Sequence, residues 1–401
     1  MKKSKILIWD KQLPLENMGG PSGYLYNIHE FLKEHPSEQI QFYSDLIMKS
    51  ETKSQRLDLR DKLKKWGVRF PALIQKLKCL HNHLHRNLYL TTQEIKLLKD
   101  FDYVHFHSFI FARAYLRDIR QQCPQLKVIL TTHTPEPYCD EYCGTVGIKW
   151  LLRLSWVRKY CIKKETDCIN NVDYMMFPTP YVKEVYTSHS RLFKQTLDNA
   201  ESKTFYVPTA ILDNVIIENK DYLKKFSLGN SLRVCYVGRH NSVKGYDFLK
   251  RIAIESWKRQ LNISFIIGGN KAGMLPLENE RWIELGWVNT MDLLQEVDVF
   301  VLPNRQTYYD LILLEVMRAG KPVLLTTTGG NKHFLGYKDT GLFFCDYSDT
   351  ETACQQLEQL SKMKAQGQLA IYGQKNRALF EKTTTMPVYI EKYLKEINKL
   401  G

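Results

Sequence analysis

The sequence predicts an α/β protein made of two doubly wound domains, and three observations support this. Short apolar runs alternate with longer amphipathic stretches, which is the pattern of parallel sheets covered by helices. The alternation begins again near residue 231, after a polar segment with weak periodicity at residues 209–230. The 401 residues exceed the length at which one hydrophobic core keeps growing. We therefore expect a first domain at residues 1–208 and a second at residues 231–380.

In the first half, apolar runs of four or five residues predict strands, and apolar residues at helical spacing predict helices. The expected strands are residues 5–9, 40–43, 103–107, 127–131, 174–177 and 204–207. The expected helices are residues 23–34, 93–100, 109–122, 148–164 and 181–186.

The second half repeats this order. The expected strands are residues 233–237, 264–268, 299–302, 322–325 and 342–344, and the expected helices are residues 245–259, 291–296, 311–319 and 350–363. A last helix at residues 386–400 has apolar positions at helical spacing, and we expect residues 386–401 to rejoin the first domain. Doubly wound sheets bind ligands at the carboxyl ends of their strands, so we expect a cleft there between the two domains.

Composition narrows the classes of function and location. The chain has 57 Lys and Arg against 43 Asp and Glu, a net charge of +14, which suits phosphorylated ligands, an anionic membrane surface or nucleic acid. Nine Cys, an odd number in a long chain, favour the reduced cytosol over a disulfide framework. The apolar run at residues 6–9 is too short for a signal peptide, and no window reaches the length of a membrane span. We expect a cytoplasmic protein that can attach peripherally to the inner face of the cell membrane.

Two glycine-containing loops follow the first strand of each half. Gly19 and Gly20 precede a predicted helix, where backbone can approach an anion closely; the alternative is an ordinary turn. In the second half, residues 237–245 place Arg239 and Lys244 before a helix, where they can bind phosphate; the alternative is a pair of solvated cations.

A carboxylate lies within the apolar helix predicted at residues 311–319. Burying an unpaired carboxylate is costly, so Glu315 needs a hydroxyl or a cation as partner. The two hydroxyls of a ribose would satisfy it, and Arg318 at helical spacing is the alternative.

Together these motifs resemble glycosyltransferase family 4, a family of retaining sugar transferases with the GT-B fold, in which two Rossmann-like domains face a cleft. The resemblance extends over almost the whole chain, through Gly19 and Gly20 and residues 102–108, 131–135, 238–245, 285–288, 297–299, 307–323 and 329–331.

The resemblance implies a role for each matching residue. Arg239 and Lys244 hold the diphosphate of a nucleotide sugar, and Glu315 binds the ribose hydroxyls. His133 lies beside the transferred sugar. The remaining donor contacts that the resemblance implies are made by the backbone. Trp287 and Val288 lie near the base, and Gly19 and Gly20 lie over the phosphates. The backbone that approaches the sugar and phosphates is that of Leu311, Ile312 and Leu313.

One position departs from the family pattern of two glutamates eight residues apart. Thr307 stands where the first glutamate is expected, and that carboxylate normally contacts the donor sugar. Asp310, where the family often has glycine, lies in the same predicted loop. We count both residues among the donor contacts, and we hypothesise that Asp310 replaces the missing carboxylate.

Histidines near the ends of strands suggest an acceptor side and raise the question of a metal. We expect His107 and Ser108 on the acceptor side. His105 and His107 share one face of a strand, and with Asp102 they could bind a metal; a packed pair of histidines is the favoured interpretation. The run His81, His83 and His85 lies in a basic stretch that we expect to be irregular and solvated. We expect no metal and no cofactor, because cations and helix dipoles can balance the diphosphate.

Positive charge is concentrated at residues 49–90, which hold eleven Lys and Arg and three Asp and Glu with apolar residues between them. This pattern suits an anionic membrane surface, and the alternative is a solvated helical hairpin. No recognition motif for nucleic acid accompanies it. Residues 148–164 carry a similar mixture, for which we expect an ordinary helix covering the sheet.

These inferences predict a retaining glycosyltransferase. It would transfer a sugar from a nucleotide donor, with a UDP-sugar favoured, to a glycan or a lipid-linked acceptor in the synthesis of bacterial surface polysaccharide. The alternative, supported by Thr307, is a catalytically silent GT-B protein that binds a glycan or a partner subunit.

Overall fold

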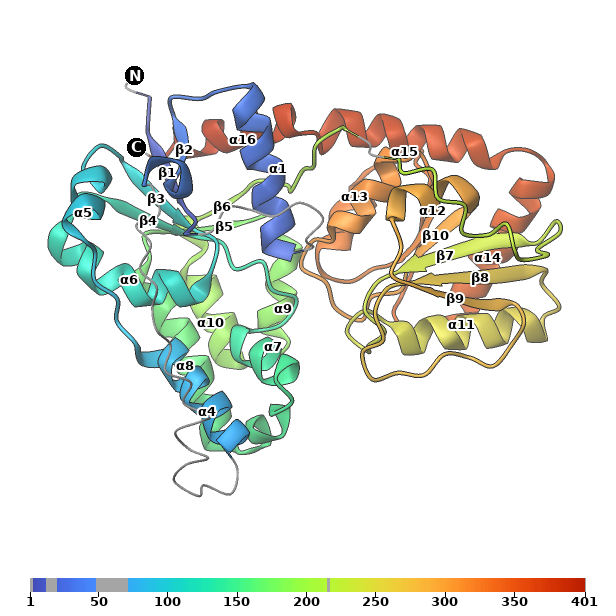
Figure 1. Cartoon of the computed structure of the whole chain (residues 1–401), viewed down its shortest axis with the longest axis horizontal. Coiled ribbons are helices and arrows are strands. Elements are labelled where there is room, and N and C mark those ends of the chain that lie inside the picture. The colour runs from blue at the N-terminus through green and yellow to red at the C-terminus, as the bar shows by residue number, and fades with distance from the viewer. Residues whose placement is uncertain (1–2, 12–19, 48–70, 215–216, 401) are drawn as a thin grey trace. The chain divides into compact units, whose positions relative to one another are not determined.

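The computed structural model describes residues 3–11, 20–47, 71–214 and 217–400 (Figure 1). The chain divides into two compact units. The first comprises Met1–Phe177, Lys183–Tyr206 and Leu394–Gly401, and the second comprises Pro178–Val182 and Val207–Tyr393.

The first unit is built on a six-stranded sheet whose pairings are all parallel. Its strands are β1 (Ile6–Trp9), β2 (Ile40–Phe42), β3 (Tyr103–Phe106), β4 (Lys127–Leu130), β5 (Tyr174–Phe177) and β6 (Thr204–Tyr206). The order β2-β1-β3-β4-β5-β6 reverses direction between β1 and β3, as in flavodoxin-like sheets. Such a switch point opens a crevice outside the carboxyl ends of the two strands.

Helices connect these strands, as parallel pairing requires. They are α1 (Gly20–Glu34), α2 (Tyr43–Leu46), α4 (Pro71–His85), α5 (Thr92–Leu98), α6 (Phe109–Gln122), α7 (Tyr138–Thr145), η1 (Lys149–Arg153), α8 (Ser155–Asn171), η2 (Pro180–Lys183), α9 (Glu184–Thr187), α10 (Arg191–Asn199) and η3 (Glu201–Lys203). The end of the chain returns to this unit, where the Tyr174 hydroxyl donates to the Leu400 carbonyl at 3.2 Å.

The second unit contains another parallel six-stranded sheet, in the order β12-β11-β10-β7-β8-β9. Its strands are β7 (Leu232–Val237), β8 (Ile263–Gly268), β9 (Trp282–Gly286), β10 (Val299–Leu302), β11 (Val323–Thr326) and β12 (Leu342–Cys345). This is the strand order of the Rossmann fold, with its switch point between β7 and β10. The two units are therefore both doubly wound, but with different strand orders.

The helices of the second unit are α11 (Tyr246–Lys258), α12 (Thr290–Glu296), α13 (Leu311–Arg318), η4 (Gly329–Gly336), α14 (Thr350–Ala365), α15 (Leu369–Thr383) and α16 (Met386–Ile397) as far as Tyr393. Strand β10 is buried along its whole length because helices cover both faces of the sheet, as Figure 1 shows. One buried cluster joins β7, β8, α11 and α14, and it holds the central strands in place.

Every predicted strand is present within one residue at each end, but β9 was missed. This edge strand reads Trp-Ile-Glu-Leu-Gly and lacks a continuous apolar run. The prediction of one helix at residues 148–164 is wrong, because the chain forms η1 and then α8, which continues to Asn171. The histidine run expected to be irregular lies in helix α4. The predicted basic surface at residues 49–90 lies partly outside the described residues.

Candidate functional site

The loop after β7 places Lys244 at the switch point of the second sheet. Its Nζ lies 2.6 Å from Oδ1 of Asp310, which belongs to the loop after β10, the neighbouring strand. The two loops pack backbone against backbone, since a Cβ on Gly245 would stand 1.7 Å from the carbonyl oxygen of Pro303. Gly245 also has φ of +71°, so only glycine fits this contact without strain. Arg239 is exposed, and its guanidinium makes no hydrogen bond or ion pair with the described residues.

Asp310 is held by two partners. Besides Lys244, it accepts a hydrogen bond from Nδ2 of Asn304, a residue that is fully buried. Asn304 is anchored in turn through its carbonyl oxygen, which accepts from Oγ1 of Thr326 at 2.6 Å. Lys244 and Asp310 therefore form a partly buried ion pair, with 20% and 15% of their side chains exposed.

Thr307 does not line an open surface in this structure. Its side chain is fully buried, and its hydroxyl finds no partner among the described residues. Its carbonyl oxygen would lie 2.0 Å from a Cβ on Gly329, so the loop also packs tightly against η4. The carboxylate available in this loop is that of Asp310, three residues further along.

Glu315 lies on α13, directly after these loops. Burial raises the pKa of its carboxyl group, and nearby Arg318 opposes the increase. The alternative of an ion pair with Arg318 is not realised, because that guanidinium donates to the carbonyl oxygens of Leu212 and Asn214, at 2.7 Å each. Among the described residues, the Glu315 carboxylate makes no hydrogen bond or ion pair, so it can accept from a ligand.

The amino end of α13 lies at the same switch point. Its first residues are Leu311, Ile312 and Leu313, of which Leu313 is buried. The first N–H groups of a helix have no partner within the helix and can bind an anion. That of Leu313 donates to the Asp310 carbonyl at 3.2 Å, whereas those of Leu311 and Ile312 have no backbone partner among the described residues. Asp310 is the N-cap residue, but its side chain makes no capping bond because it pairs with Lys244.

Trp287 and Val288 follow the edge strand β9. The Trp287 side chain is 65% exposed, whereas Val288 is buried. Val288 packs against the end of β8, where a Cβ on Gly268 would stand 2.7 Å from its Cγ2. Lys220 lies over the Trp287 ring at 6.0 Å.

In the first unit, three histidines cluster at the carboxyl ends of β3 and β4. Nδ1 of His107 lies 2.8 Å from Nε2 of His133, and the rings of His105 and His107 are 4.0 Å apart. Nε2 of His105 is bonded to Oγ1 of Thr131 at 2.8 Å. Burial lowers the pKa of all three imidazoles, that of His133 to about 3, so the rings are neutral at physiological pH.

His133 adopts an unusual backbone conformation and contacts helix α1. Its φ of +56° lies in the left-handed region, which non-glycine residues rarely occupy and which is enriched at functional sites. The Tyr24 ring of α1 packs on His133, with ring centroids 4.6 Å apart. Gly20 begins this helix with φ of +68° and open space where a Cβ would stand, whereas Gly19 lies outside the described residues.

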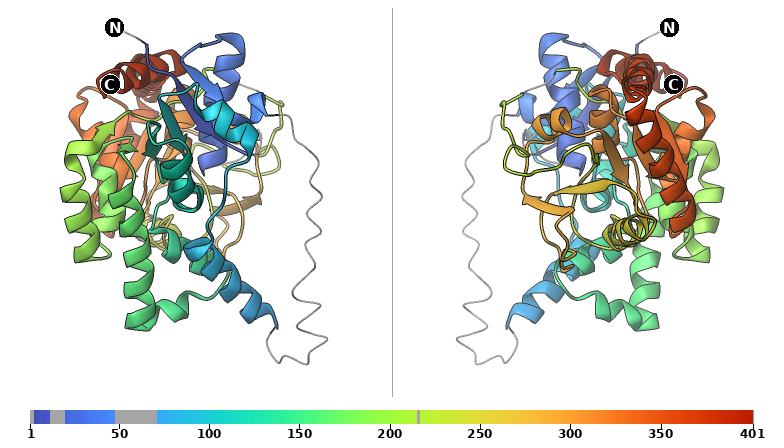
Figure 2. Two further views of the ribbon diagram at one scale, coloured as in Figure 1. Left: turned by 90° about the vertical axis from the view of Figure 1, so that its left-hand side faces the viewer. Right: turned by 90° about the vertical axis from the view of Figure 1, so that its right-hand side faces the viewer.

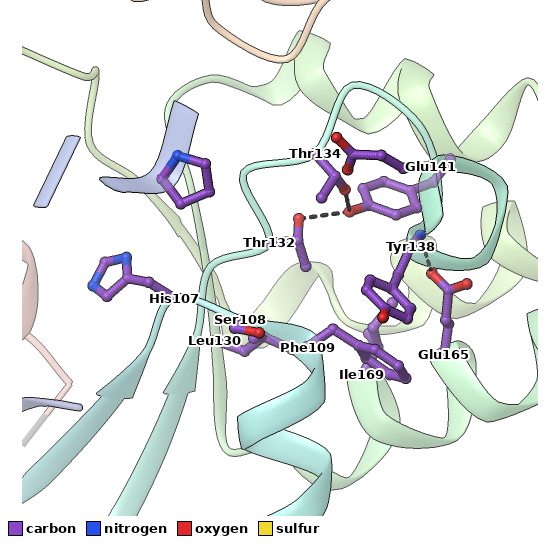
Figure 3. Close-up of a pocket in the computed structure, with 12 residues that line it drawn as sticks. His107, Ser108, Phe109, Leu130, Thr132, Thr134, Tyr138, Glu141, Glu165 and Ile169 are labelled. Carbon is purple, nitrogen blue, oxygen red and sulfur yellow. Dashed lines mark hydrogen bonds between the residues drawn. The ribbon is translucent and has the colours of Figure 1, made fainter. Parts of the chain in front are cut away.

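A cavity of about 300 Å³ opens beside these histidines (Figure 3). Its lining comes from the ends of β3 and β4 and from α1, α6, α7, α8 and α9: Pro21, His107, Ser108, Phe109, Leu130, Thr132, Thr134, Tyr138, Glu141, Glu165, Ile169 and Tyr186. The Tyr186 hydroxyl donates to Oγ1 of Thr132 at 2.6 Å. Nε2 of His107 is buried without a partner among the described residues, so this wall has an unused polar atom.

Glu165 forms part of the cavity wall and caps α7. Its carboxylate accepts from the backbone N–H groups of Tyr138 at 2.9 Å and Cys139 at 3.0 Å. Burial raises the pKa of this carboxyl group to about 7, although the two N–H groups favour the charged form. Glu165 was not predicted from the sequence. Its signal is the one that identified Glu315, a carboxylate at a buried position of an otherwise apolar helical face.

The structure thus brings Lys244 and Asp310 into contact in one unit and His107 and His133 into contact in the other. No group of three or more His, Cys, Asp or Glu residues able to hold a metal ion occurs within the described ranges. His105 and His107 form the packed pair that the sequence favours, and Asp102 accepts from the Lys5 backbone N–H at the opposite end of β3. Across the part of the chain that the structure covers, no helix has the length and apolar character to span a membrane.

Comparison with known proteins finds a family match within the second unit. Residues 231–363 match the family model described as Glycosyl transferases group 1. A Klebsiella pneumoniae protein described as an uncharacterized 41.2 kDa protein in cps region is 24% identical over 247 residues, which cover 57% of this chain. The match spans 62% of the length of that relative.

Several solved structures resemble the whole chain. HepE of Anabaena, in complex with UDP and glucose, has a TM-score of 0.59 at 11% identity, covering 98% of this chain and 99% of its own. Sucrose-phosphate synthase of Thermosynechococcus elongatus has a TM-score of 0.62 at 13% identity, covering 99% of both chains. The lipopolysaccharide outer core galactosyltransferase WaaB, in its apo form, has a TM-score of 0.59 at 13% identity, again covering 99% of both chains.

The chain therefore adopts the GT-B glycosyltransferase fold, as predicted. The stretch that matches the Glycosyl transferases group 1 model lies in the second unit and includes Arg239, Lys244, Asp310 and Glu315. Membership of glycosyltransferase family 4 in particular stays a prediction.

Proposed function

We propose that this chain is a retaining glycosyltransferase that transfers a sugar from a nucleotide diphosphate donor, with a UDP-sugar favoured. The observation that carries the proposal is the unpaired carboxylate of Glu315, one helical turn beyond the amino end of α13 and next to the Lys244 loop. The domain match at residues 231–363 and the UDP-containing HepE structure support the same class of donor.

The donor contacts follow from charge and position. Arg239 binds phosphate through its planar guanidinium, and Lys244 contributes a point charge once a phosphate replaces Asp310 as its partner. The free N–H groups of Leu311 and Ile312 add two donors at the helix end. Glu315 accepts from the ribose hydroxyls, and the backbone at Trp287 and Val288 contacts the base.

The chemistry needs few protein groups. The bond between the sugar anomeric carbon and the diphosphate oxygen breaks, and the acceptor oxygen bonds to that carbon from the same face. The proton of the acceptor hydroxyl passes to the departing diphosphate. Arg239, Lys244 and the α13 dipole stabilise the negative charge that develops there, so we propose that no divalent metal or cofactor is required. His133 orients the transferred sugar.

We propose that the acceptor is a glycan or a lipid-linked saccharide, bound on the side of His107 and Ser108. The unused Nε2 of His107 and the aromatic cavity wall suit a hydroxylated ring. The cps-region relative and the structural likeness to WaaB support a role in bacterial surface polysaccharide synthesis. A lipid-linked acceptor places the protein at the cytoplasmic face of the membrane.

The test is release of nucleotide from UDP-, GDP- and ADP-sugars without acceptor, in the presence of EDTA. We expect slow hydrolysis of one donor, unchanged by the chelator and lost in Glu315→Ala. The matched control is Glu358→Gln, a half-exposed glutamate on α14 that pairs with Lys362, and it should behave as wild type.

Each other result has a definite meaning. Activity that stops with EDTA and returns with Mg²⁺ would contradict the metal-free mechanism. Full activity of Glu315→Ala would contradict the donor site. Absence of binding and turnover of every donor would favour the catalytically silent alternative, which the burial of Thr307 in place of a carboxylate would then explain.

A further inference from the structure

The start of α8 and the segment before it expose an unusual amount of aromatic surface. Trp156 is 71% exposed and Trp150 is 52% exposed, and Leu154 between them is 43% exposed. Large aromatic side chains bury 150–250 Å² each when covered, so leaving two of them in water forgoes a substantial hydrophobic gain. These residues therefore indicate a surface that contacts something other than water.

The same segment is strongly basic. Residues 142–164 contain six Lys and Arg and no Asp or Glu. Lys149 and Arg158 are used within the fold, by Glu136 at 2.8 Å and Asp140 at 3.5 Å. The other exposed cations, Arg153, Lys159 and Lys163, make no ion pair with any described residue.

Helical spacing puts these groups on one face. Trp156, Lys159 and Lys163 recur at intervals of three and four residues along α8, so they lie one above another. The opposite face packs into the unit through Cys161, Ile162, Glu165, Cys168 and Ile169, all buried. The sequence predicts an ordinary cover for the sheet here, but the first turns of the helix instead present tryptophan and lysine outward.

Helix α4 extends this surface. Ile74 and Leu77 are each 37% exposed, and α4 has no acidic residue. It packs on α7, where the Tyr142 hydroxyl donates to the Lys76 carbonyl at 3.2 Å, and on α8, where Tyr160 is bonded to His85. Figure 1 and Figure 2 show α4 and the segment leading into α8 at the same end of the first unit.

We propose that this tryptophan surface docks on an anionic lipid bilayer. We define it by Ile74, Leu77, Trp150, Leu154 and Trp156 together with Arg153, Lys159 and Lys163. Tryptophan is favoured at the level of lipid headgroups, and cations beside it are attracted by anionic lipids. A second copy of the chain is disfavoured, because a two-fold contact through this surface would oppose cations with cations. The inference rests on the proposed membrane location, and it is independent of the transfer chemistry.

The test is co-sedimentation with two kinds of vesicle, phosphatidylcholine alone and phosphatidylcholine mixed with phosphatidylglycerol. Wild type should bind the anionic vesicles at low salt, and binding should weaken as salt is added. Arg153→Gln/Lys159→Gln/Lys163→Gln should lower the partition on the order of a hundredfold, since each cation contributes on the order of 1 kcal/mol near the surface. Trp150→Ala/Trp156→Ala should lower it at least about tenfold.

Matched variants separate this surface from general effects of charge and hydrophobicity. Lys258→Gln/Lys338→Gln/Lys382→Gln removes the same charge from exposed positions of the second unit, and Leu275→Ala removes a side chain that is 78% exposed. Both should bind vesicles as wild type does. Donor hydrolysis in solution and the melting temperature should be unchanged in the surface variants, so loss of docking is distinguishable from loss of the catalytic site.

Three results would overturn the proposal. The first is wild-type binding to neither vesicle, and the second is equal binding of wild type and the tryptophan variant. The third is a wild-type dimer in solution that Trp150→Ala/Trp156→Ala converts to a monomer, which would assign the surface to a second copy.

Discussion

The ion pair between Lys244 and Asp310 opposes donor binding, and Asp310→Asn should therefore strengthen the binding of UDP. The pair has an Nζ to Oδ1 distance of 2.6 Å and is mostly shielded from water. A diphosphate needs the same Lys244 charge, so in wild type it must first displace the Asp310 carboxylate. Asparagine retains the size of the side chain and can still accept from Asn304, but it leaves Lys244 unpaired.

The size of the effect follows from the strength of this pair. A hydrogen bond to a charged group contributes about 1.5–3 kcal/mol, and the remaining exposure reduces this toward about 1–2 kcal/mol. Since 1.4 kcal/mol is a factor of ten, the affinity for UDP should rise by about 5- to 30-fold. If Asp310 also contacts the donor sugar, turnover of the UDP-sugar should fall in the same variant.

Two measurements separate these contributions: the Kd of UDP by calorimetry and the rate of donor hydrolysis. The control is Asp298→Asn, which breaks an ion pair of the same length, 2.6 Å to Lys364. Asp298 directly precedes β10, at the amino end of the strand, whereas Asp310 follows its carboxyl end. It should lower stability without changing the affinity for UDP. An Asp310→Asn variant that binds UDP no better than wild type would refute the argument that the pair competes with the ligand.

Three further predictions rest on single contacts. Arg239→Gln should weaken UDP binding at least about tenfold by calorimetry. The melting temperature should not change, because the guanidinium makes no hydrogen bond or ion pair with the described residues. A lower melting temperature would show a structural role instead. Gly245→Ala should lower the free energy of unfolding in urea by about 2–4 kcal/mol, because its Cβ would stand 1.7 Å from the carbonyl oxygen of Pro303 at φ of +71°. In the control Gly336→Ala, the added Cβ meets no atom within 4 Å, and the free energy of unfolding should fall by less than about 1 kcal/mol. Folding raises the pKa of Glu165 from 4.5 to about 7, so the free energy of unfolding should fall as pH rises through this interval. Glu165→Gln should remove that part of the pH dependence. A variant with the same pH profile as wild type would contradict the shift.

The sequence predicts most of this architecture because buried parallel strands are short continuous apolar runs. It fails where the local signal is weak or where a distant contact decides the structure. The edge strand β9 has a glutamate at its centre and looks like a loop. The loss of a carboxylate at Thr307 is visible in the sequence, but its burial and the pairing of Asp310 with Lys244, 66 residues away, depend on how two loops pack.

The first unit shows the same limit. Spacing along one strand places His105 and His107 on one face, but the bond between His107 and His133 joins two different strands. The exposure of Trp150 and Trp156 was also unexpected, because apolar residues at helical spacing normally indicate a buried face. Here α8 begins at Ser155 and the first of its buried residues is Cys161, so Trp156 lies before the buried part of the helix.

The backbone contact between Gly245 and Pro303 restricts how this protein can acquire a new donor preference. With no room for even one carbon atom between the two loops, neither can lengthen or tilt without separating Lys244 from the amino end of α13. Variation is therefore confined to side chains near this contact, of which Asp310, the N-cap residue of α13, is the clearest example. A library that replaces residues at such positions should yield active proteins with altered donor choice, whereas insertions into either loop should yield inactive ones.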